Sequence, residues 1–106
     1  MCANEVVVEV TAPDNSQRAI IFVRDCGATT KFSTQISIVP SGRSLPNKAG
    51  NVFVAETGLE PNNVGADGRH AVSVSWLSSS ALLVSHIGGI RVFRNATQVS
   101  GVTISY

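Results

Sequence analysis

Apolar and polar residues alternate along several short stretches of this chain. In Glu5–Val10 the even positions are apolar and two of the odd positions are acidic, which is typical of a half-buried β-strand. Val72–Trp76 alternates more regularly still, with a serine after each valine. By contrast, Ala19–Val23 is apolar at every position and indicates a central strand buried on both faces. We expect Trp76 to anchor the core, with a hydrogen-bond partner for its indole N–H.

Turn and loop sequences separate these strands. Pro13–Ser16 predicts a hairpin turn, because proline presets φ and the Asp and Asn that follow bond their own backbone. Gly88–Gly89 predicts a second, two-residue hairpin. Loops are expected over residues 41–50 and 57–69. Eight extended runs are predicted in all, over residues 5–10, 19–23, 32–38, 52–55, 72–76, 81–86, 90–93 and 102–106.

The order of these runs favours one architecture. No run has a helical period long enough for a crossover connection, so consecutive strands should pair antiparallel. A single open sheet of eight strands would leave an apolar face in water. We therefore expect a single all-β domain over residues 1–106, folded as an antiparallel β-sandwich or as a meander partly closed into a barrel.

The composition supports strands and excludes several partners. Val and Ile outnumber Leu and Met by 22 to 6 among the 106 residues. Charged residues make up 14% of the chain and the formal net charge is +1, so a basic face for nucleic acid or an anionic membrane is not expected. The longest apolar run, Ala19–Val23, is far shorter than a spanning helix. We expect neither nucleic-acid binding nor a transmembrane segment.

The segment from Arg24 to Thr34 interrupts the strand pattern and concentrates polar side chains. One hypothesis makes Cys26 a thiolate nucleophile whose pKa is lowered by Arg24 or Lys31. No catalytic signature surrounds Cys26, and the simpler interpretation is a β-bulge or tight turn with Cys26 buried as a small apolar residue. The enzymatic hypothesis also needs an acid–base set drawn from Asp25, His70 and His86.

The same segment supplies the side chains that we expect to contact a ligand or partner. Polar loops on a rigid scaffold suit recognition, and the candidates are Arg24, Asp25, Thr29, Thr30 and Lys31. A metal site built from the two histidines with Cys26 or Asp67 would lack the short ligand spacing of zinc sites. We expect no metal and no other cofactor.

Two cysteines leave the cellular compartment open. Cys2 and Cys26 can pair as a disulfide in an exported protein or stay reduced in the cytoplasm. Alternatively, Cys2 is the lipid-bearing first residue of a mature bacterial lipoprotein, and residues 1–4 are the remnant of its anchor. A native Met1 with an incidental Cys2 competes with that interpretation, and no apolar leader decides between them.

Short motifs occur along most of the chain, namely Asn4–Val7, Ala12–Asp14, Arg24–Thr30, Phe32–Gln35 with Ser37–Ile38, Gly50–Phe53 and Trp76–Ser78. Together they resemble a family of small uncharacterised bacterial proteins. The family usually has glycine in the first turn where this chain has Asn15, which a left-handed Asn accommodates. Several members look like lipoproteins that start near a cysteine equivalent to Cys2, and similar proteins occur in mobile integron gene cassettes. The resemblance implies a cell-envelope or periplasmic location but no activity, ligand or catalytic residue.

These observations favour a non-enzymatic binding module of the cell envelope over an enzyme that uses Cys26. A third hypothesis is a homo-oligomer held by an exposed strand edge or by apolar residues such as Phe93 and Tyr106. The final run carries no lysine or proline that would block edge-to-edge pairing.

Overall fold

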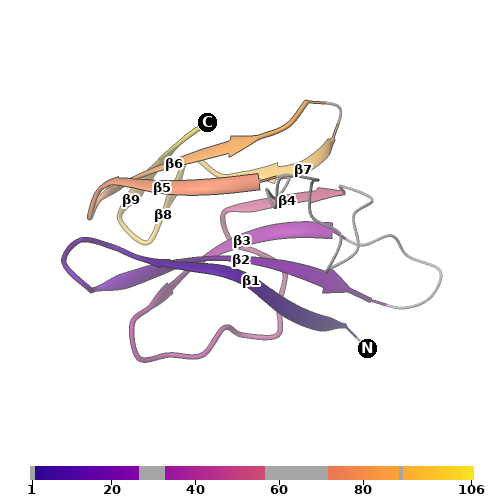
Figure 1. The fold of residues 1–106 in the computed structure, drawn as a ribbon, viewed down its shortest axis with the longest axis horizontal. Helices are drawn as coiled ribbons and strands as arrows, with labels where there is room; N and C mark the ends of the chain where they lie inside the picture. The colour runs from indigo at the N-terminus through magenta and orange to yellow at the C-terminus, as the bar shows by residue number, and fades with distance from the viewer. Residues whose placement is uncertain (1, 27–32, 57–71, 89) are drawn as a thin grey trace.

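A computed structural model describes residues 2–26, 33–56, 72–88 and 90–106. Within these ranges the fold is all-β, and its two sheets face each other without closing into a barrel (Figure 1). The predicted sandwich is therefore confirmed. The described strands are β1 (Ala3–Thr11), β2 (Gln17–Asp25), β3 (Ser33–Pro40), β4 (Phe53–Glu56), β5 (Val72–Ser78), β6 (Ala81–His86), β7 (Arg91–Asn95), β8 (Gln98–Val99) and β9 (Val102–Ser105).

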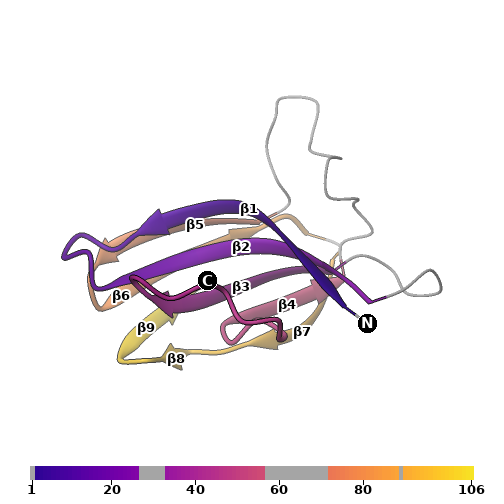
Figure 2. The same cartoon turned by 90° about the horizontal axis from the view of Figure 1, so that it is seen from below.

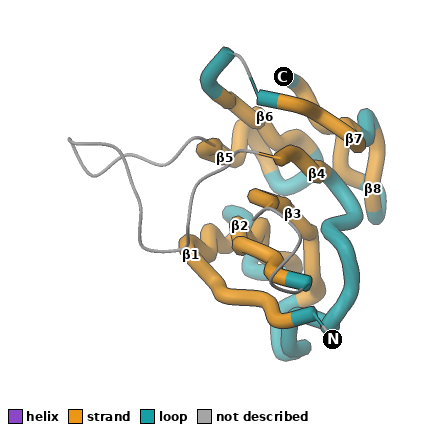
Figure 3. The backbone as a smooth tube through the Cα atoms, turned by 90° about the vertical axis from the view of Figure 1, so that its right-hand side faces the viewer, coloured by secondary structure: helices purple, strands orange, loops and turns teal. Residues whose placement is uncertain are grey.

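The strands divide unequally between the two layers. Sheet A has five strands in the order β1-β2-β3-β4-β7, and sheet B has four in the order β5-β6-β9-β8. Seen from the side, β5 and β6 lie in one layer and β1, β2 and β3 in the other (Figure 3). The two-residue strand β8 has no counterpart among the predicted runs, because so short a strand leaves no alternation to read.

Two features of the topology depart from the expectation. The predicted Gly88–Gly89 hairpin is wrong: β6 belongs to sheet B, whereas β7 pairs with β4 in sheet A. Strand β9 runs parallel to the non-consecutive strand β6, with Leu82 opposite Ile104, whereas the expected sandwich was antiparallel. A parallel neighbour needs no helix here because the connection between β6 and β9 passes through the opposite sheet as β7.

The core lies between the sheets. Phe53, Leu82 and Val102 are completely buried there, together with aliphatic side chains from β2, β3 and β6. Trp76 packs against this core half-buried rather than anchoring its centre. Its indole Nε1–H donates to the carbonyl oxygen of Val10 at 2.8 Å, so the predicted partner for the N–H exists and ties β5 to β1.

The β1–β2 hairpin follows the sequence closely. Asn15 adopts φ 62°, the left-handed conformation expected of it. The Asp14 carboxylate accepts hydrogen bonds from the Ser16 hydroxyl at 2.6 Å and the Ser16 amide at 3.0 Å. These bonds, the hydroxyl first, lower the pKa of Asp14 below its ordinary value of 3.8. All five residues of Ala19–Val23 are buried, which confirms β2 as a central strand.

The outer face of sheet A is covered by residues 41–52, here called the covering loop. This loop joins β3 to β4 on the side of sheet A that faces away from sheet B (Figures 1 and 2). Its Leu45 packs on a second apolar cluster of Ile20, Phe22 and Val39. Under this loop, the polar side chains of Gln35 and Ser37 on β3 are consequently only 4% and 5% exposed.

Candidate functional site

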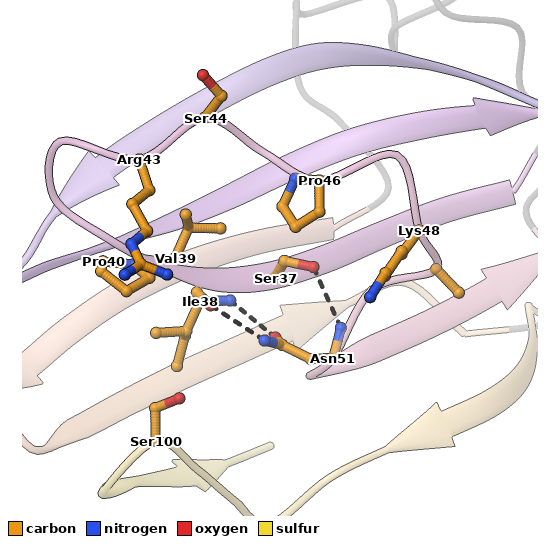
Figure 4. Close-up of a pocket in the computed structure, with 11 residues that line it drawn as sticks. Ser37, Ile38, Val39, Pro40, Arg43, Ser44, Pro46, Lys48, Asn51 and Ser100 are labelled. Atoms are coloured by element: carbon orange, nitrogen blue, oxygen red, sulfur yellow. Dashed lines mark hydrogen bonds between the residues drawn. The ribbon is translucent and has the colours of Figure 1, made fainter.

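A cavity of about 280 Å³ opens beside β3, under the covering loop. Strand β4 is short, and its pairing with β3 ends where Ile36 faces Phe53. The edge of β3 from Ile38 to Pro40 therefore has no strand on that side. The cavity lies along this open edge, between the covering loop and Ser100 in the β8–β9 turn (Figure 4).

Asn51 takes the place of the missing strand. Its side-chain Oδ1 accepts from the Ile38 amide at 2.9 Å, and its Nδ2 donates to the Ile38 carbonyl at 3.0 Å (Figure 4). The Asn51 amide in turn donates to the Ser37 hydroxyl at 3.1 Å. An Asn side chain carries the same donor and acceptor as a peptide group. It therefore satisfies the backbone N–H and C=O of Ile38 as a neighbouring strand would. Pro40, which ends β3, has no N–H to satisfy.

The covering loop is held to sheet A along its length. Gly50 closes it against β3: its amide donates to the buried Gln35 side chain at 2.7 Å, and an added Cβ would lie 2.6 Å from the Ile36 carbonyl oxygen. Only glycine allows this approach. Further tethers run from Ser41 to Ser16, from the Arg43 carbonyl to Arg18, from the Pro46 carbonyl to Asn4, and from Asn47 to Arg24 and Cys2.

Two cations line the cavity. Arg43 and Lys48 extend toward it from opposite sides (Figure 4). Within the described ranges, neither side chain takes part in a hydrogen bond or an ion pair. The other lining residues are apolar or carry hydroxyl and amide groups, so the described walls contain no carboxylate, imidazole or thiol. The cavity is preformed, apolar in part and positively charged.

The predicted binding residues fall into two groups. Arg24 is the second-last residue of β2, and its Nη1 donates to Asn4 at 2.7 Å and to Asn47 at 2.9 Å, so this guanidinium holds the covering loop in place. Asp25, the last residue of β2, pairs with Ala3 of β1. The remaining candidates, Thr29, Thr30 and Lys31, lie outside the described residues.

The two cysteines meet. Cys2 and Cys26 form a disulfide one position beyond the last β1–β2 pair, which joins Ala3 to Asp25. A disulfide sulfur is not a thiolate, so Cys26 cannot act as the predicted nucleophile while this bond is intact. The same bond occupies the sulfur of Cys2, to which a lipid would be attached. The sequence left open a disulfide, two reduced cysteines or a lipid on Cys2, and the structure shows the disulfide.

His86, the described member of the histidine pair, is also engaged. Its Nδ1 lies 2.9 Å from the Ile87 carbonyl oxygen, and its ring stacks on Phe53 with centroids 5.5 Å apart. His70 and Asp67 lie outside the described residues. In the part of the chain that the structure covers, no three His, Cys, Asp or Glu residues group as metal ligands. The described segments also contain no helix long and apolar enough to cross a membrane.

The residues predicted to support oligomers are differently placed. Strand β9 lies between β6 and β8, so the final strand is not the sheet edge that the expectation required. The Tyr106 hydroxyl donates to the Ala96 carbonyl at 2.7 Å, and burial raises the pKa of this phenol. Phe93 is 59% exposed on the edge strand β7, with the Arg91 guanidinium over its ring.

The cavity was not found from the sequence. Residues 41–50 were correctly expected to form a loop, but nothing in their composition indicates that the loop folds back over β3. One signal was present: Gln35 and Ser37 carry hydrogen-bonding groups next to the apolar Ile36 and Ile38 of β3, and both are used to hold the covering loop. Compared with protein-family models, curated proteins and solved structures, the chain gives no match.

Proposed function

We propose that this protein is a non-enzymatic binding module that holds a small ligand in the cavity between β3 and the covering loop. The observation that carries the proposal is a cavity whose walls are fixed before any ligand arrives. Asn51 and Gly50 lock the covering loop to β3, while the side-chain donors of Arg43 and Lys48 have no acceptor among the described residues. A preformed site of this kind spends little free energy on ordering when it binds.

The chemistry of the described residues supports binding rather than catalysis. Covalent or acid–base catalysis needs a nucleophile or a proton-transfer group within reach of the substrate. The described cavity walls carry neither a nucleophile nor a proton-transfer group. Cys26 is part of a disulfide, and the Nδ1 of His86 is hydrogen-bonded to the Ile87 carbonyl. The proposed ligand site therefore lies under the covering loop rather than in the segment from Arg24 to Thr34 that the sequence favoured, most of which is outside the described residues. Of the predicted binding residues, Arg24 still contributes to this site, because it holds Asn47 of the covering loop.

We also propose that the protein resides in an oxidising compartment, such as the bacterial cell envelope or periplasm. Disulfides persist in exported proteins and are rare in the cytoplasm. The Cys2–Cys26 bond supports that location. Because this bond and a thioether-linked lipid compete for one sulfur, the proposed envelope protein is not anchored through Cys2.

Fragment titration of the isotope-labelled protein tests the site. Small anionic, neutral and cationic compounds are added in turn, and amide chemical shifts are followed. We expect at least one class to shift the amides of Ile38, Lys48 and Ser100, while Leu77 and Thr103 in sheet B serve as internal references. If no class moves the cavity amides at about 10 mM, well above the millimolar affinity of small fragments, the proposed function fails.

A further inference from the structure

The arginines of this protein are not equivalent. Arg18 donates to Glu9 and to the Arg43 carbonyl, Arg24 to two asparagines, and Arg94 to the Gly50 carbonyl at 2.7 Å. The guanidinium of Arg91 lies over the Phe93 ring. Arg43 and Lys48 differ from these, because among the described residues nothing accepts from their side chains. Both belong to the cavity, whose lining contains no acid.

The backbone beside these cations is already satisfied. The Ile38 amide and carbonyl are bonded to Asn51, and Pro40 has no N–H. The edge therefore offers no row of free amides of the kind that cradles a compact phosphate. Charge recognition at this site falls to the two long side chains, which approach from opposite sides of the cavity (Figure 4).

The rest of the cavity limits the size and polarity of a ligand. Ile38, Val39, Pro40, Pro46 and Ala49 contribute to the lining. The volume of about 280 Å³ lies just below the range of roughly 300–1,000 Å³ that is usual for ligand pockets. A small molecule with an apolar middle and charged ends fits these walls better than a large or wholly polar one.

We propose that the cavity binds a small organic anion, namely carboxylate groups joined by a short apolar chain. Arg43 donates to one carboxylate through its planar guanidinium, Lys48 faces the other as a point charge, and the chain lies on the apolar residues between them. This inference rests on the proposed function and adds the class of ligand to it.

The test compares matched probes in titrations followed by amide shifts. The probes are adipate with two carboxylates, hexanoate with one, neutral hexanamide of the same chain length, and inorganic phosphate. We expect adipate to bind with a Kd of about 1 mM, hexanoate more weakly, and hexanamide and phosphate at least about tenfold more weakly than adipate. Added salt should weaken adipate binding, because both cations are solvent-exposed.

Variants separate specific recognition from general charge attraction. Arg43→Gln and Lys48→Gln should each weaken adipate binding by about tenfold, since each removes one charge-assisted contact. Because neither side chain forms a hydrogen bond within the part of the chain that the structure describes, the variants should keep the dispersed amide spectrum of the folded protein. Arg91→Gln removes the same charge from β7, outside the cavity lining, and should leave the affinity unchanged.

Four results of these titrations would overturn the organic-anion inference. Equal binding of hexanamide and hexanoate at the cavity amides overturns the anion inference and leaves the binding function standing. An Arg91→Gln loss as large as that of Arg43→Gln shows attraction to net charge alone and also overturns it. If phosphate binds more tightly than adipate, the ligand class is wrong. If no probe moves the cavity amides, the inference falls, and the wider fragment titration then decides the function.

Discussion

The two faces of sheet A are covered in different ways. The inner face packs against sheet B through aliphatic and aromatic side chains, among which Ile36 and Phe53 are completely buried. The outer face has a smaller apolar cluster, which the covering loop contacts through Leu45. The covering loop itself is held by directional hydrogen bonds, such as those of Asn51 with Ile38.

The inner face therefore determines the stability of the whole domain, whereas the covering loop shapes the proposed ligand site. Apolar burial scales with area and holds the whole sandwich together, so damage to the inner face should lower the free energy of global unfolding. Each hydrogen bond of the covering loop contributes about 1 kcal/mol and acts on one segment, so damage there should open the loop locally. The proposed ligand site lies under the covering loop, which hydrogen bonds hold in place. It adjoins a sandwich that apolar burial stabilises.

The largest expected effect comes from a truncation in the inner face. Phe53→Ala removes a fully buried ring that also stacks on His86, and it should cost about 3–5 kcal/mol of unfolding free energy. Urea unfolding followed by Trp76 fluorescence measures this loss. Phe93→Ala is the matched control, because Phe93 is 59% exposed, and it should change stability by no more than about 0.5 kcal/mol. Equal losses in the two variants would contradict the assignment of the core.

The disulfide should have the next largest effect. Replacing Cys2 and Cys26 together by serine frees a cross-link between residues 24 positions apart, which should cost about 2–4 kcal/mol. The change also loosens the chain end whose Cys2 carbonyl accepts from Asn47, so the covering loop should exchange its amide hydrogens faster. Iodoacetamide should add no label to the native protein and two after reduction. Labelling before reduction would show that the cysteines are not paired.

The contrast between the faces also explains what the sequence could predict. Alternation and apolar runs report burial against a sheet, and they correctly located β2, β5 and most other strands. They do not report which sheet a strand joins: β7 follows Gly88–Gly89, a strong hairpin signal, yet it pairs with β4. Partner choice depends on total packing across both sheets, which no local window of sequence contains.

The cavity escaped prediction for a related reason. Ser37 and Gln35 look like solvent-facing residues because they are polar, and only the folded covering loop turns them into buried acceptors. Lys48 and Arg43 look like ordinary loop charges until Figure 4 places them around one hollow. Sites made by long-range polar contacts leave little periodic trace, whereas the local turn of Asp14 and Asn15 was predicted correctly.

A substitution in the covering loop sharpens the comparison directly. Asn51→Ala leaves the Ile38 amide and carbonyl without partners, and it should cost about 1–2 kcal/mol. Amide exchange should rise at Ile38, while the amide of Leu82 in sheet B stays protected. Ser44→Ala, an exposed change in the same loop, should leave both quantities unaltered. If Asn51→Ala accelerated exchange at Ile38 and Leu82 equally, the covering loop would belong to the global folding unit.

The smallest expected effect lies in the β1–β2 turn, outside both faces. The folded-state pKa of Asp14 is lowered by the Ser16 hydrogen bonds, so the ionised carboxylate stabilises the folded chain above the ordinary value of 3.8. This contribution is lost as the pH falls through the lowered folded-state pKa. Asp14→Asn keeps an acceptor oxygen but cannot titrate, and it should therefore be slightly less stable than the parent near pH 6 and equal to it near about pH 2. Urea midpoints at the two pH values measure the difference, which exposure of the turn keeps small. A parent advantage that persists unchanged at low pH would show that the Asp14 carboxylate does not act through its charge.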